Sequence, residues 1–83
     1  MISVVSTPGV ISVAGHAEDP RVCAAVSALS GTLYAGYGAD RPREGQFRWK
    51  HGIRNVTEVV DFVMNAFRVL ERQYPTQIQV QED

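Results

Sequence analysis

The 83-residue sequence has one cysteine and no apolar run close to the roughly 20 residues that cross a membrane. A single cysteine cannot close an intramolecular disulfide, which excludes a small secreted scaffold held together by disulfide bonds. The start, Met1-Ile2-Ser3, lacks the basic residues of a secretory signal peptide. We therefore expect a cytoplasmic protein with no membrane partner. Glycine-rich phosphate-binding motifs of the Walker or dinucleotide type are also missing.

The composition, 45% hydrophobic and 20% charged, is that of a globular chain rather than a disordered one. The length gives one domain, residues 1–83, and leaves no room for a second. A domain of this size buries only about 60% of the surface that its unfolded chain exposes. Its stability should be modest, and dimerisation would help.

Charge is unevenly distributed along the chain. Five of the eight basic residues lie between positions 41 and 54, where Glu44 is the only acid, so this segment carries +4 and the remainder −5. Such a segment is suited to an acidic partner, or is simply a solvated edge. The alternation of residues 46–50 would turn Phe47 and Trp49 away from Arg48 and Lys50. Because stacking aromatics and phosphate-binding cations would then face opposite sides, we expect no nucleic-acid partner.

Two periodicities predict an α/β (α+β) fold in ββαβαβ order, with two helices packed on one face of a small sheet. Strands are expected at 1–7, 10–14, 46–50 and 77–81, and Thr7-Pro8-Gly9 is a hairpin turn signal. The first helix should run from Pro20 until Gly36 and Gly38 end it. The second should run from Asn55, at an N-x-x-E start, to Pro75. The apolar positions expected to face the core are Val22, Val26, Leu29, Leu33 and Tyr37 in the first helix, and Val56, Val59, Val60, Val63, Phe67, Leu70 and Tyr74 in the second.

Three apolar residues of the second helix, Phe62, Met64 and Val69, lie off its main stripe. Phe62 and Val69 are seven residues apart and share a second face. Two interpretations remain open: this face is a subunit contact, or it widens a stripe buried within the monomer.

The segment His16-Ala-Glu-Asp-Pro-Arg-Val-Cys23 places a histidine at the end of a predicted strand and the cysteine in the first turn of a predicted helix. Asp19 suits the N-cap and Pro20 the first helical position. Unpaired amides and the helix dipole favour negative charge there. Since the thiolate is the nucleophilic form of cysteine, a neighbouring imidazole and this helix start would suit a Cys-His pair. The competing interpretation is that Cys23 is inert core filler.

The sequence Gly15-His16-Ala17, followed by Val22-Cys-Ala-Ala-Val-Ser-Ala-Leu29, resembles the ribosomal-processing cysteine protease (Prp) family. The likeness continues through Ala66–Leu70, a Tyr74-Pro75 stop and Ile78-Gln79-Val80, and weakens between residues 34 and 54. The resemblance implies a homodimeric enzyme that removes an N-terminal extension from a ribosomal protein. Phage relatives act on, or are assigned to, capsid or scaffold precursors.

By this resemblance Cys23 would be the nucleophile and His16 the general base. The backbone amides near Val22 and Cys23 are candidates to hold the oxyanion, with Ser27 and Asp19 as further candidate site residues. We expect a peptide or protein substrate, no cofactor and no metal. A zinc site from His16, Cys23 and His51 would lack a fourth ligand and any paired ligand motif.

The chain departs from the family pattern in its His-to-Cys loop, which is several residues shorter and holds Pro20 where the family usually has an acid. In the family that loop is thought to be mobile and to admit substrate. A stiff, short loop predicts a narrower cleft, another specificity or no turnover. The alternative function is therefore a catalytically inactive, phage-encoded Prp-fold binding protein that holds a protein partner.

Overall fold

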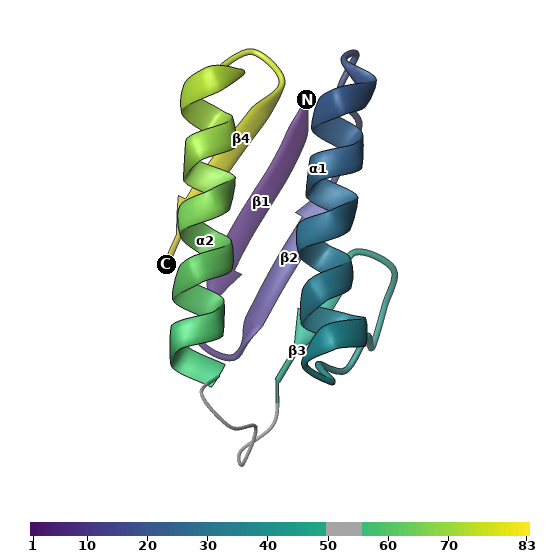
Figure 1. The fold of residues 1–83 in the computed structure, drawn as a ribbon, viewed down its shortest axis with the longest axis vertical. Helices are drawn as coiled ribbons and strands as arrows, with labels where there is room; N and C mark the ends of the chain where they lie inside the picture. The colour runs from purple at the N-terminus through teal and green to yellow at the C-terminus, as the bar shows by residue number, and fades with distance from the viewer. Residues whose placement is uncertain (50–55) are drawn as a thin grey trace.

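The computed structural model describes residues 1–49 and 56–83, and both helices lie on the same face of the sheet (Figure 1). Its elements are β1 (Ile2–Thr7), β2 (Val10–Ala14), α1 (Pro20–Gly31), a π-helical turn η1 (Thr32–Gly36), β3 (Gln46–Arg48), α2 (Val56–Gln73) and β4 (Ile78–Glu82). The predicted ββαβαβ order and the placement of both helices on one face are confirmed. The predictions for Lys50, His51, Arg54 and Asn55 fall outside the described residues.

The sheet has the strand order β3-β2-β1-β4. β1 and β2 form the predicted antiparallel hairpin across Pro8 and Gly9, with Val4 opposite Val13. β3 is antiparallel to β2, whereas β4 runs parallel to β1 and sets Val80 beside Val4. The two ends of the chain thus supply neighbouring strands, and the strand before the His-to-Cys loop lies inside the sheet.

Strand alternation decides which side chains enter the core. On β3, Phe47 is buried and Arg48 is exposed, as predicted, and Trp49 packs against the edge of the core. The buried apolar residues come from every strand and from both helices: Ile2, Val4, Ile11, Val22, Val26, Leu33, Ala39, Phe47, Val63, Met64, Phe67 and Ile78. The core therefore lies between the sheet and the helix pair.

The first helix ends differently from the prediction. α1 stops at Gly31, and residues 32–36 continue as a π-helical turn instead of extending the α-helix. At this junction the Thr32 hydroxyl donates to the Ala28 carbonyl, 2.8 Å away, while the Thr32 amide is shared between Ala28 and Leu29. The wider turn rotates the following residues relative to α1. The expectation that Tyr37 faces the core is consequently wrong, since Tyr37 is 48% exposed.

The buried apolar stripe of α2 is broader than the helical period of its apolar residues predicts. Met64, expected off the main stripe, is buried, because it follows Val63 directly and lies three residues before Phe67. Phe62 and Val69 are exposed, so the predicted second face of α2 is present on this chain. None of the helices in residues 1–49 and 56–83 combines the length and the apolar character that a membrane span needs.

Candidate active site at the end of β2 and the start of α1

Gly15 turns the chain out of β2 toward α1. Its φ of +92° lies in the left-handed region, and a Cβ at this position would collide with the Met1 carbonyl oxygen. Only glycine therefore fits easily between β2 and the backbone at the start of β1. The turn places His16 outside the sheet, with its side chain exposed.

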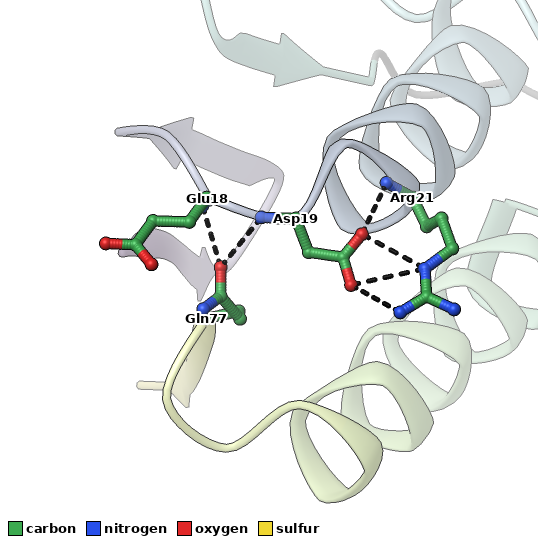
Figure 2. A network of polar contacts seen from close by, with 4 residues as sticks. All are labelled: Glu18, Asp19, Arg21 and Gln77. Atoms are coloured by element: carbon green, nitrogen blue, oxygen red, sulfur yellow. Dashed lines mark hydrogen bonds and ion pairs between the residues drawn. The ribbon is translucent and has the colours of Figure 1, made fainter.

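The start of α1 is fixed by Asp19 and Arg21. The Asp19 carboxylate accepts a hydrogen bond from the Arg21 amide at 2.9 Å, and it forms an ion pair with the Arg21 guanidinium at 2.7 Å (Figure 2). The predicted N-cap role of Asp19 is thus seen in the geometry, with Pro20 in the first turn. The hydrogen bonds from Arg21 lower the pKa of Asp19 below its usual value of 3.8, and the same contact raises the pKa of Arg21. Arg21 also lies over the Tyr74 ring, 5.8 Å from its centre.

Gln77, immediately before β4, binds the backbone of the loop between His16 and Cys23. Its side-chain oxygen accepts hydrogen bonds from the Glu18 amide at 2.7 Å and the Asp19 amide at 3.2 Å (Figure 2). Its backbone carbonyl accepts from the Ile2 amide at 2.8 Å. The alternating pattern of residues 77–81 predicts only that Gln77 is a polar strand residue. A contact across 58 residues leaves no local signal that could have identified it.

Cys23 is half-buried in the first turn of α1 and packs against the edge of the core. Its thiol donates to the Ala17 carbonyl, with 3.5 Å between sulfur and oxygen. Within the described residues, no side-chain hydrogen bond joins Cys23 to His16 or to Ser27. The loop therefore places His16 and Cys23 on adjoining elements, with the thiol directed at the residue that follows the histidine.

The amides at the start of α1 already have partners. Val22 and Cys23 both donate to the Asp19 carbonyl, at 3.1 and 3.4 Å, and Arg21 donates to the Asp19 side chain. Pro20 has no N–H to offer. The Val22 side chain is fully buried in the core. The arrangement predicted for an oxyanion site at Val22 and Cys23 would therefore require these amides to be shared with, or released from, Asp19.

A cleft of about 570 Å³ opens beside His16, between the outer side of β2 and the outer face of α1. His16 and Ser27 line it, together with the exposed Arg41 and Glu44 of the loop before β3. Cys23, Val22 and Asp19 do not line this cleft. Its remaining lining residues are Val13, Ala14, Gly15, Val26, Ser30, Gly31, Tyr34, Gly45 and Phe47. The candidate site residues are thus divided between the cleft and the end of α1 next to it.

Ser30 is the buried polar residue of this cleft. It is 8% exposed, and its hydroxyl has no hydrogen-bond partner in the described structure. Buried hydroxyls usually have a hydrogen-bond partner, so a polar group bound in the cleft would supply the partner that the Ser30 hydroxyl lacks. Across residues 1–49 and 56–83, no three histidine, cysteine or acidic side chains are grouped closely enough to hold a metal ion.

Comparison with protein-family models and with curated proteins finds no match. Among solved structures, the chain is similar to an essential ribosomal processing protease, Prp, from S. aureus, in complex with a covalently linked product peptide. The two share 22% sequence identity, the superposition covers 100% of both chains, and the TM-score is 0.71. The chain has the Prp fold. The resemblance predicted from the His16 and Cys23 segments is therefore confirmed in the architecture of the whole chain.

Proposed function

We propose that this protein is a cysteine endopeptidase that uses Cys23 as nucleophile and His16 as general base. The observation that carries the proposal is the position of these two residues at either end of one short loop, with His16 lining a cleft, in a chain with the Prp fold over its full length. The thiol is half-buried and the imidazole is exposed, and six residues separate them along the chain. Catalytic hydrogen bonds are often longer before substrate binds.

In the proposed reaction His16 takes the thiol proton, and the Cys23 sulfur attacks the carbonyl carbon of the peptide bond. The C–N bond breaks as the imidazolium returns the proton to the leaving amine, which leaves a thioester on Cys23. Water then attacks the thioester carbon while His16 accepts a proton from it, and the carboxylic acid and the thiol are released. No cofactor enters either step.

The substrate that we propose is an extended peptide, an N-terminal extension or precursor segment of a ribosomal protein or of a phage capsid or scaffold protein. The product peptide linked to the S. aureus protein supports a peptide substrate. The cleft has an apolar floor that includes Val26 and Phe47, and side chains of both charges, Arg41 and Glu44, line it. This lining suits a peptide with an apolar residue rather than one strongly charged throughout.

The test is cleavage of a proteome-derived peptide library, read by mass spectrometry, for the parent, Cys23→Ala and His16→Ala. We expect both variants to lose cleavage by at least about a thousandfold, as removal of a nucleophile or its base does in other proteases. Ser3→Ala, on the opposite face of the sheet, is the matched control and should cleave like the parent. Iodoacetamide should also alkylate Cys23 more slowly in His16→Ala. Cleavage by a folded Cys23→Ala variant at the rate of the parent would contradict the proposal.

A second candidate, a Prp-fold peptide-binding protein without turnover, is favoured by one observation. The first-turn amides of α1 are bonded to Asp19, and the thiol is bonded to Ala17 rather than to His16. This candidate predicts no cleavage by the parent. It also predicts that a His16→Ala, Cys23→Ala double variant binds its partner as tightly as the parent does.

Homodimer formation is part of the proposal and concerns the opposite side of α1. An apolar groove of about 720 Å³ lies between α1 and α2, where Phe62 is 72% exposed and Val69 is 46% exposed. Small side chains, those of Ala25, Ala28 and Ala66, line the same groove. A second copy could insert its Phe62 there, which is the self-complementary arrangement that a two-fold dimer requires.

A further inference from the structure

β2 extends beyond the strand that covers its outer edge. β3 pairs with β2 only from Val10 to Ser12, and one more hydrogen bond, from the Val13 amide to the Gly45 carbonyl at 2.6 Å, closes that side. On its other side β2 pairs with β1 as far as Ala14. Past Val13, Ala14 at the end of β2 and Gly15 directly after it therefore have no strand on their outer side within the described residues. The cleft lies along this uncovered length.

Gly15 offers a hydrogen-bond donor at this edge. Amide groups alternate in direction along a strand, so the Gly15 N–H, two residues after that of Val13, is directed to the same outer side. It has no hydrogen-bond partner in the part of the chain that the structure describes. Gly15 is exposed and lines the cleft, so an incoming chain can reach this amide.

The buried part of the cleft lining, from α1 and β3, is suited to a side chain of that incoming chain. Val26 and Phe47 are buried apolar residues of the lining, and the unpartnered Ser30 hydroxyl lies with them. Alternate side chains of an added strand point to opposite faces of the sheet. One side chain in two would enter the cleft, and the others would point away from the helices.

The uncovered edge also leads to the candidate dyad. His16 follows Gly15 directly, and the carbonyl of the next residue, Ala17, accepts the hydrogen bond from the Cys23 thiol. A chain lying along β2 past Gly15 would pass His16 and reach the surroundings of Cys23. Its backbone would then be held where the proposed reaction needs a peptide bond.

We propose that the cleft binds its peptide as an additional β-strand on the edge of β2, with a peptide carbonyl accepting the Gly15 N–H and an apolar side chain directed at Val26 and Phe47. The proposal rests on the proposed peptidase function, because it states how that substrate lies. Recognition by strand addition relies on main-chain hydrogen bonds, and alternate side chains supply the specificity. The substrate is therefore an extended segment with apolar residues at alternate positions and many sequences allowed between them.

The probe for this proposal is a heptapeptide selected from a displayed library of linear peptides on the immobilised Cys23→Ala variant. Amide hydrogen exchange of that variant, followed by NMR, should slow at Gly15 by at least about tenfold when the peptide saturates it. The amide of Gly9, in the turn at the other end of β2, is the internal control and should not change. Replacing a peptide amide bond by an ester removes its N–H and weakens its carbonyl as an acceptor. We expect binding to weaken about tenfold when the replaced bond is the one whose carbonyl meets Gly15 or the one before it, whose N–H also faces β2, and little when it is a bond farther along the peptide.

Unchanged exchange at Gly15 in the saturated complex would overturn strand addition, and so would a selection that yields no peptide bound at the cleft. Cleavage of the same peptide by the parent protein separates this proposal from the proposed function. Cleavage without protection of the Gly15 amide would support the proposed peptidase function and contradict strand addition. Protection of Gly15 without cleavage would leave strand addition as the binding mode of a protein without turnover.

Discussion

Two places where the sheet lacks a neighbouring strand differ: the outer edge of β4, and the end of β2 that β3 does not cover. At β4, the Val80 amide points away from β1, and the Glu71 carboxylate of α2 accepts its hydrogen bond at 2.6 Å. Arg68 of the same helix pairs with Glu82 at 3.3 Å, farther along the strand. At β2, the amide of Gly15 faces a cleft and has no partner within the described residues. One edge is closed by side chains, and the other is open.

This difference shows how a four-stranded sheet can allow another strand to pair at the end of β2 and prevent pairing at β4. Exposed edge strands pair readily with other chains, and proteins usually block them with charges or cover them. The block on β4 is a carboxylate placed by α2, so pairing at that edge would first have to displace it. The opening at β2 lies beside the candidate dyad, where an added strand is useful. Substitutions at Gly15 and at Glu71 change these two places separately.

Gly15→Ala should have the largest effect on folding. The new Cβ would collide with the Met1 carbonyl, and alanine would have to adopt a φ near +92°. We expect a loss of about 3 kcal/mol in the free energy of unfolding, measured by urea denaturation, from backbone strain and overpacking together.

Gly9→Ala is the matched control for this variant. Gly9 has a similar φ of +83°, but a Cβ there would meet nothing within 4 Å. Only the backbone strain remains, so the loss should be about 1 kcal/mol. Equal losses for the two glycines would show that the close approach of Met1 to Gly15 does not constrain the open edge.

Glu71→Ala should open the closed edge. The Val80 amide would lose a charged acceptor, which corresponds to a loss of about 2 kcal/mol in the free energy of unfolding. Sedimentation velocity over a range of concentrations should also show association beyond that of the parent, because the unpaired edge can add a strand. The parent runs serve as the reference and report whether the protein is a dimer.

Glu71→Gln is the conservative variant, because its amide oxygen can still accept from Val80. It should recover most of the stability and the association behaviour of the parent. If Glu71→Ala and Glu71→Gln associate alike, the carboxylate is not what closes β4.

The sequence predicted the elements on both edges better than it predicted the contacts that distinguish them. Alternation and helical period identified the strands, the burial of Phe47 and the positions of His16 and Cys23 around one loop. The resemblance to the Prp family, carried by short motifs, is confirmed as a fold. Both depend on residues close together in the chain, where spacing alone carries information.

The contacts that could not be predicted join distant residues or depend on local detail. Glu71 closing β4 and Gln77 holding the Glu18 and Asp19 amides are single side chains whose partners follow only from the packed structure. The burial of Met64 depends on how α2 packs against the sheet beside α1, which periodicity alone does not predict. The use of the Val22 and Cys23 amides by Asp19 is likewise a matter of cap geometry.

The smallest effect concerns the charge that fixes α1 beside the open edge. The pKa of Asp19 is lowered by its hydrogen bonds with Arg21, so the ionised carboxylate stabilises the folded state, and this contribution is lost as pH falls through the lowered value. Asp19→Asn keeps an N-cap side chain but not the charge. In urea denaturation the parent should be the more stable of the two at about pH 7, and the difference should shrink at acid pH, below the usual pKa of 3.8. Because the pair is exposed, salt should shrink the difference at neutral pH as well. A difference that is the same at neutral and acid pH would mean that the cap, and not the charge, holds the start of α1.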